Sequence, residues 1–89
     1  MILRKTKAFK RDEQKVTISD KHFTKLIEAL YCLAQAKPLA LEFKDHALTG
    51  EWADFRECHI SGDLLLIYQV GEISIKLVRL GSHNQLFKG

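Results

Sequence analysis

The C-terminal part of the chain holds three side chains whose chemical types suit RNA cleavage. Arg79 lies inside a strand-like apolar run, residues 73–80, and His83 and Phe87 follow the glycine that comes after it. Histidine moves protons near neutral pH, the planar fork of arginine matches a phosphate, and an aromatic ring stacks on an unstacked RNA base. In a small basic protein, these three side chains together point toward RNA and toward cutting it.

Two more histidines, His46 and His59, lie in a central segment of mixed polarity. Glu57 and His59 are two positions apart in a predicted strand, so their side chains share one face. If that face is open, both side chains meet the substrate; otherwise Glu57 is a buried acid that needs a partner. A structural alternative for Arg79 is a salt bridge with a neighbouring strand residue such as Glu57. The histidines lack a paired His/Cys spacing, so we expect no metal site and no cofactor.

Positive charge is concentrated at the N-terminus. Residues 1–25 hold eight lysines and arginines and three acids, a net charge of +5, so the rest of the chain sums to −2 within the overall +3. Such a segment attracts polyanions through long-range steering. The alternative is an ordinary solvated helix face.

The bulk composition bounds the class of protein. A length of 89 residues predicts one domain over residues 1–89. Cys32 and Cys58 show no CxxC spacing, which indicates reduced thiols rather than a disulfide framework. The start of the chain turns polar at once, and no apolar run approaches the ~20 residues of a membrane helix. We therefore expect a cytoplasmic protein without a membrane partner.

Periodicity and turn residues predict two helices followed by a meander of strands. A short strand over 2–4 precedes a helix over 7–16 capped by Thr6, and a second helix begins at Ser19 or Asp20 and is stopped by Pro38. The second helix carries one apolar stripe, formed by Phe23, Leu26, Ile27, Leu30, Tyr31 and Ala34. Residues 39–49 look irregular, and strands are predicted over 52–60, 64–70 and 73–80, the middle one buried on both faces, with a terminal turn over 82–86. This order predicts an α+β fold, with two N-terminal helices packed on one face of a small antiparallel sheet.

Three motifs occur in the second half of the chain: residues 44–52, residues 55–60 with 63–68, and residues 79–83 with 86–87. In order and spacing they resemble the YafQ branch of the RelE/ParE toxin superfamily, whereas residues 1–43 match only in general layout. The resemblance implies the RelE-like microbial ribonuclease fold. It also implies a ribosome-dependent mRNA endonuclease (an mRNA interferase), the toxin of a type II toxin–antitoxin pair.

The resemblance implies the site residues as well. Family active-site positions, with a glutamate that related members add, fall on His46, Glu57, His59, Asp63, Arg79 and His83. The resemblance also implies substrate binding at Phe87, while the positive charge of residues 1–25 predicts contacts of Lys7, Lys10 and Arg11 with ribosomal RNA. Asp63 has the alternative of simply closing the turn after Gly62. Leu64 stands where some members have tryptophan, which leaves the contact role of that position open.

The implied partners are mRNA in the ribosomal A site, the ribosome itself, and a partly disordered DinJ- or RelB-like antitoxin. Two other functions fit the same fold: a ParE-like toxin that poisons gyrase by binding alone, and a non-catalytic module of a repressor complex. The cluster of histidines and acids argues against a pure binder, which has no need of several proton-transfer groups.

Overall fold

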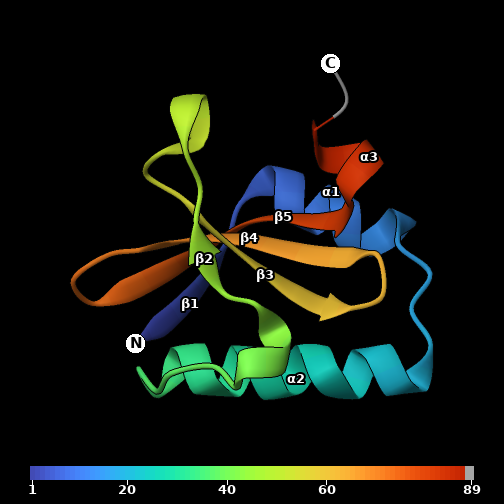
Figure 1. Cartoon of the computed structure of the whole chain (residues 1–89), viewed down its shortest axis with the longest axis horizontal. Coiled ribbons are helices and arrows are strands. Elements are labelled where there is room, and N and C mark those ends of the chain that lie inside the picture. The colour runs from blue at the N-terminus through green and yellow to red at the C-terminus, as the bar shows by residue number, and fades with distance from the viewer. Residues whose placement is uncertain (88–89) are drawn as a thin grey trace.

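The computed structural model describes residues 1–87, in which three α-helices pack around a five-stranded sheet (Figure 1). The helices are α1 (Lys7–Lys15), α2 (Asp20–Ala34) and α3 (His83–Phe87). The strands are β1 (Ile2–Lys5), β2 (His46–Ala47), β3 (Arg56–Ser61), β4 (Leu64–Val70) and β5 (Ser74–Ser82). The predicted α+β class is confirmed.

The strands are ordered β1-β5-β4-β3-β2. Strands β3, β4 and β5 pair antiparallel, as predicted, and the unpredicted β2 pairs antiparallel with β3. In contrast, β1 pairs parallel with β5, so the sheet is mixed rather than wholly antiparallel. The parallel pair joins residues about 72 positions apart, beginning at Ile2 opposite Ser74. The prediction used short connections between consecutive strands, which give no information about so distant a pairing.

Side-chain oxygens cap the N-termini of both long helices. The Thr6 hydroxyl accepts a hydrogen bond from the Phe9 amide at 3.0 Å, and the Ser19 hydroxyl accepts one from the His22 amide at 3.2 Å. Each bond satisfies one of the amides that a helix start leaves unpaired. The predicted starts of both helices are therefore confirmed.

The C-terminus of α2 is closed by its backbone at Ala34, four residues before the proline that was predicted to stop it. Ala36 adopts a left-handed conformation with φ 55°. Its amide donates to the Leu33 carbonyl at 3.1 Å, and the Lys37 amide donates to the Cys32 carbonyl at 2.9 Å. This pair of bonds is the Schellman motif, which usually places glycine at the position of Ala36.

Strand β4 is the centre of the core and is buried on both faces, as predicted. Leu64, Leu66 and Tyr68 pack with residues of α1 and α2, whereas Leu65 and Ile67 pack on the opposite face with α3 and the segment around Gly50–Trp52. Figure 1 shows α2 lying along one face of the sheet. The face that α2 does not cover is called the open face below.

Four details differ from prediction. The strand expected over 52–60 begins at Arg56, because Gly50–Trp52 forms a single 3₁₀ turn, and the segment expected to be irregular contains the two-residue β2. The last strand starts and ends later than expected, at Ser74 and Ser82. The apolar stripe of α2 is wider than its contact with the sheet: Leu26, Ala29 and Leu33 are buried, but Phe23, Ile27 and Tyr31 are 53%, 48% and 56% exposed.

Within residues 1–87, no helix has the length and apolar character needed to cross a membrane.

Candidate active site

The register of the sheet aligns four residues across the open face. His46 lies opposite Glu57, Glu57 opposite Ile67, and Ile67 opposite Arg79. Directly opposed residues of an antiparallel pair project to the same face. Neighbouring strands are ~4.8 Å apart, so the backbones of Glu57 and Arg79 are about 10 Å apart, with the buried Ile67 between them.

The next row of the same face brings His59 and His83 to one end of the sheet. His59 lies opposite Leu65, and Leu65 lies opposite Gly81, which precedes His83 by two residues. The two histidines are thus placed on either side of β4, His59 two residues after Glu57 in β3 and His83 four residues after Arg79, at the start of α3. Five of the six predicted catalytic residues are brought to the open face in this way.

Glu57 lies between two histidines. Its Oε1 is 3.4 Å from His59 Nε2 and 3.7 Å from His46 Nε2, and the two imidazole rings have centroids 6.3 Å apart. The Glu57 side chain is only 7% exposed, whereas those of His59 and His46 are 36% and 48% exposed. Glu57 is therefore the buried acid with partners that the sequence raised as a possibility, and it can hold a proton-carrying imidazolium on either side.

A hydrogen bond to the backbone determines which ring nitrogen of His46 can take up a proton, and this nitrogen is Nε2. Its Nδ1 is 2.7 Å from the Lys44 carbonyl oxygen. A carbonyl oxygen only accepts hydrogen bonds, so Nδ1 carries the proton. In the neutral ring Nε2 is then the basic nitrogen, and it faces Glu57.

His83 opens α3 and is exposed, and an aromatic chain connects it to the rest of the open face. Its ring centroid is 5.0 Å from that of Phe87, which is 5.4 Å from Trp52, which in turn is 5.4 Å from Phe55. Phe87 is partly buried against this cluster, so one side of its ring packs on the protein.

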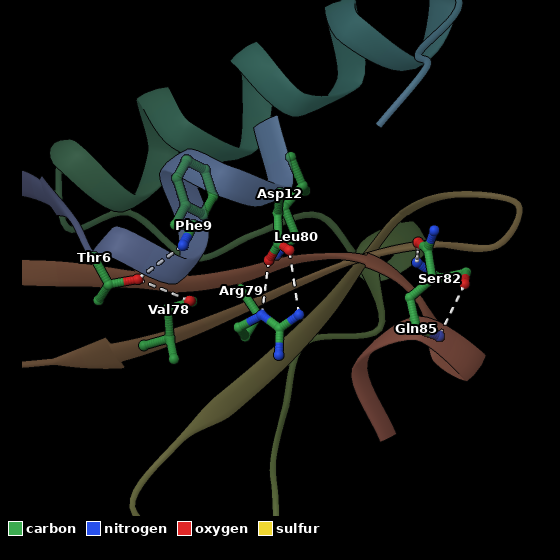
Figure 2. A network of polar contacts seen from close by, with 8 residues as sticks. All are labelled: Thr6, Phe9, Asp12, Val78, Arg79, Leu80, Ser82 and Gln85. Atoms are coloured by element: carbon green, nitrogen blue, oxygen red, sulfur yellow. Dashed lines mark hydrogen bonds and ion pairs between the residues drawn. The ribbon is translucent and has the colours of Figure 1, made fainter. Parts of the chain in front are cut away.

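A reciprocal cap fixes the start of α3. The Ser82 amide donates to Gln85 Oε1 at 2.8 Å, and the Gln85 amide donates to the Ser82 hydroxyl at 3.2 Å (Figure 2). This is the capping box of the pattern Ser-x-x-Gln. A Cβ at Gly81 would lie 2.8 Å from Gln85 Oε1 and 3.2 Å from Leu86 Cδ2, so a larger residue here would displace the Gln85 side chain that closes the cap. The sequence predicts only a turn over 82–86, although the Ser-x-x-Gln spacing is the signal that could have identified this cap, which positions His83.

Arg79 forms a salt bridge, but with a different partner from the one considered above. Its Nε donates to Asp12 Oδ2 at 2.8 Å and its Nη2 donates to Asp12 Oδ1 at 3.2 Å, while the Leu80 amide donates to Asp12 Oδ2 at 2.9 Å (Figure 2). Glu57 is two strands away in the same row. No local sequence signal could identify Asp12, because it is 67 positions from Arg79.

The ion pair shifts the ionisation of both partners. Burial acts to raise the pKa of the Asp12 carboxyl, but the hydrogen bonds from Arg79 and from the Leu80 amide outweigh it and lower the pKa below its usual value. The hydrogen bond from Arg79 to Asp12 raises the pKa of the guanidinium. Both groups are therefore charged at neutral pH.

Asp63 is the predicted catalytic residue that the structure sets apart. It is exposed in the β3–β4 turn and borders an open hollow of about 420 Å³ at the end of the sheet, with Lys15, His22 and Ser82. Within residues 1–87 it has no side-chain hydrogen bond or ion pair to a histidine. Leu64, next to it, is 8% exposed and packs in the core on the α2 side of the sheet.

The three predicted RNA-contacting residues of α1, Lys7, Lys10 and Arg11, are all exposed. Cys58 points into the core on the α2 side, where burial raises the pKa of its thiol to about 12. It therefore stays protonated and is no nucleophile. In the part of the chain that the structure describes, no three His, Cys, Asp or Glu side chains are grouped so as to hold a metal ion.

The chain is similar to known toxins in sequence. A family model described as "Bacterial toxin of type II toxin-antitoxin system, YafQ" matches residues 1–88. The chain is 47% identical over 66 residues to the putative toxin YafQ of Haemophilus influenzae, and this aligned segment covers 70% of this chain and 65% of that protein. It is 38% identical over 50 residues to the mRNA interferase toxin YafQ of Escherichia coli strain K12, which covers 56% of this chain and 54% of that protein. The chain thus aligns with less than two thirds of the length of each relative.

Solved structures share the whole fold. A copper-bound mutant toxin from Helicobacter pylori matches with a TM-score of 0.88 and 40% identity over 97% of this chain and 98% of that one. YafQ from the E. coli DinJ–YafQ complex matches with a TM-score of 0.82 and 28% identity over 96% of both chains. With the family model covering nearly every residue, these matches show that the chain belongs to the YafQ family of bacterial type II toxin–antitoxin toxins.

Proposed function

We propose that this chain is an mRNA interferase, a metal-independent endoribonuclease that cuts mRNA in the ribosomal A site. The observation that carries the proposal is the placement of the His46–Glu57–His59 cluster, Arg79 and His83 on one face of the sheet. The mRNA interferase activity named for the E. coli relative supports the same function.

In the proposed reaction the RNA 2′-oxygen attacks the adjacent phosphorus and the bond from phosphorus to the 5′-oxygen breaks. A base takes the 2′-hydroxyl proton, and an acid gives a proton to the leaving 5′-oxygen. The His46–Glu57–His59 cluster and His83 supply these two groups from opposite sides of β4. Arg79 neutralises the charge that builds on the phosphate, and a well-placed donor of this kind contributes about 3–4 kcal/mol. Phe87 stacks on a base, and Asp63 contacts a base edge at the rim.

The proposed partner in the cell is an antitoxin resembling DinJ, since the E. coli relative has been solved in a DinJ–YafQ complex. The exposed apolar line of Phe23, Ile27 and Tyr31 on α2 supports contact with a protein, because contiguous exposed apolar surface marks interaction sites. A partly disordered acidic segment that folds on binding would also pair with the charges of the open face.

The proposed docking surface for the ribosome is the basic face of α1, with Lys7, Lys10 and Arg11 exposed. Contacts of lysine and arginine with phosphates release counterions, which makes such binding steeply dependent on salt. Because the proposed substrate is mRNA on the ribosome, the proposed location of the protein is the cytoplasm.

A single 2′-deoxy substitution tests the function. Purified protein is added to ribosomes programmed with mRNA, and cleavage is followed with and without a chelator. We expect cleavage that is unaffected by the chelator, is abolished by a 2′-deoxynucleotide at the cleaved position, and leaves a 2′,3′-cyclic phosphate. Intact mRNA together with inhibited gyrase supercoiling would instead identify a gyrase poison.

A further inference from the structure

The Asp12 carboxylate accepts two hydrogen bonds from the Arg79 guanidinium and thereby orients it. The two bonds from Arg79 are parallel, Nε to one carboxylate oxygen and Nη2 to the other, and this bidentate geometry fixes the plane of the fork. Figure 2 shows the guanidinium held below Asp12, on the side of β5 away from α2. The side chain of Asp12 is 12% exposed and that of Arg79 is 29% exposed, so solvent reaches the arginine more readily than the acid.

The carboxylate also fixes the strand that carries Arg79. Asp12 Oδ2 accepts from the Leu80 amide at 2.9 Å, on the stretch of β5 beyond the end of β1. At the other end of this stretch the Thr6 hydroxyl donates to the Val78 carbonyl at 2.9 Å. Thr6, at the start of α1, and Asp12, in its middle, therefore bind β5 on either side of Arg79. Beyond the end of β1, α1 is the neighbour of β5.

The remaining donors of Arg79 are available to a ligand. A guanidinium has five N–H donors, and Asp12 engages one on Nε and one on Nη2. Among residues 1–87, no side chain or backbone group accepts from the second N–H of Nη2 or from the two of Nη1, and these three N–H groups point away from the carboxylate. A hollow of about 250 Å³ beside the ion pair is lined by Asp12, Arg79, Lys15 and Gln85, so a phosphate can approach the site.

We propose that Asp12 is a positioning residue for RNA cleavage, which holds the free edge of the Arg79 guanidinium toward the phosphate of the substrate. The inference rests on the proposed function, since it assigns Asp12 a role through Arg79. Asp12 also links α1, whose exposed basic residues face the ribosome in our proposal, to the arginine that acts on the phosphate. The negative charge of Asp12 weakens the attraction between Arg79 and the phosphate of the bound substrate. The orientation that Asp12 gives to Arg79 stabilises the charge that builds on the phosphate in the transition state.

The test is Asp12→Asn, with Glu13→Gln as its matched control. Both changes remove one negative charge from α1, but Glu13 is paired with Lys5, at 2.7 Å, and does not touch Arg79. Asparagine can still accept a hydrogen bond from the Leu80 amide, which favours retention of the fold. Single-turnover cleavage on programmed ribosomes gives the rate at saturating toxin and the toxin concentration at half-saturation.

For Asp12→Asn we expect the saturating rate to fall roughly 10- to 100-fold, as for a misplaced catalytic group. The half-saturating concentration should stay the same or fall, because a repulsive charge is removed from the phosphate site. A role limited to stability would instead raise the half-saturating concentration and leave the saturating rate unchanged. Glu13→Gln should cleave at the wild-type saturating rate.

Non-additivity separates this inference from the proposed function. In an Arg79→Ala background, Asp12→Asn should cause no further loss, because the residue through which it acts is gone. If Asp12→Asn cuts at the wild-type rate while Arg79→Ala is inactive, the positioning role is wrong and the proposed function stands. If Arg79→Ala is itself fully active, the role of Arg79 fails and the inference fails with it, whereas a wild-type protein that leaves mRNA on ribosomes intact would contradict the proposed function. Should Asp12→Asn fail to fold, Asp12→Glu takes its place. It keeps the charge and moves the carboxylate by one methylene, and a wild-type saturating rate would overturn the inference.

Discussion

Glu57 and Arg79 occupy one transverse row of the sheet, two strands apart, with the buried side chain of Ile67 between them. Each belongs to its own cluster of polar side chains. Glu57 lies between His46 and His59, and Arg79 is hydrogen-bonded to Asp12. The clusters are separated by an apolar residue, so they do not neutralise each other. A phosphate on the open face therefore meets proton-transfer groups on one side and a guanidinium on the other.

Glu57→Gln should lower the single-turnover cleavage rate by about 10- to 100-fold. The amide keeps the shape of the side chain but removes the charge that stabilises a proton-carrying His59 or His46, and one acid–base group contributes typically 10²–10⁴-fold. Glu51→Gln, an exposed acid on the segment before β3, is the control and should cut normally. Wild-type cleavage by a folded Glu57→Gln protein would show that the buried carboxylate has no part in catalysis.

The Asp12 carboxylate should stabilise the fold at neutral pH and lose this effect in acid. Its pKa is lower in the folded protein than in the unfolded chain, so its contribution is fully present above the usual aspartate pKa of about 3.8 and disappears as pH falls through the lowered value. Asp12→Asn should therefore cost roughly 1–3 kcal/mol of unfolding free energy at pH 7. Urea titrations of both proteins from pH 7 down to pH 3 measure the difference, which should shrink below about pH 4. A difference that stayed constant, or grew, over that range would contradict this account.

Ala36→Gly should raise the unfolding free energy by about 0.5–1 kcal/mol. Ala36 is held at φ 55° in the Schellman motif that ends α2, a conformation that glycine adopts without steric cost. Ala40, at φ −59°, provides the control: Ala40→Gly should be neutral or destabilising, because it only adds freedom to the unfolded chain. Denaturant unfolding curves decide the point, and a loss of stability in Ala36→Gly would mean that α2 does not end in this way.

Reversing the charges of the exposed α1 residues should weaken binding to ribosomes without unfolding the protein. The triple variant changes Lys7, Lys10 and Arg11 to glutamate, and a control variant changes three exposed lysines elsewhere, Lys21, Lys37 and Lys76. Co-sedimentation across a salt series should show a shallower salt dependence for the α1 variant, because fewer counterions are released. Equal losses in both variants would indicate a general effect of charge rather than a docking face.

The predictable part of this fold depends on local chemistry. Thr6 and Ser19 cap helices within three residues of themselves, and the apolar run of β4 announces burial on both faces, so each of these features could be recognised from neighbouring positions. The parallel β1–β5 pair and the Asp12–Arg79 ion pair join residues about 70 positions apart, and nothing in the chain near either partner marks them.

The same distinction applies to the site. Glu57 and His59 could be placed on one face from their spacing alone, and the Ser82–Gln85 capping box that positions His83 was present in the sequence as a pattern. The approach of His46 to Glu57 depends on the short strand β2, which is too brief to have a periodicity. Half of the apolar stripe predicted on α2 is exposed, because hydrophobic spacing alone does not distinguish a core contact from an exposed apolar surface.

Single-turnover cleavage of mRNA on programmed ribosomes by His83→Ala and Arg79→Ala tests the central claim most directly. His83 is exposed and Arg79 lies at the edge of the sheet, so neither change empties the core, and circular dichroism melts verify that each variant is folded. Because His83 supplies a proton transfer and Arg79 the charge on the phosphate, each variant should cut at least about 10²-fold more slowly than wild type. Folded variants that cut at the wild-type rate would show that the active site is not on this face of the sheet.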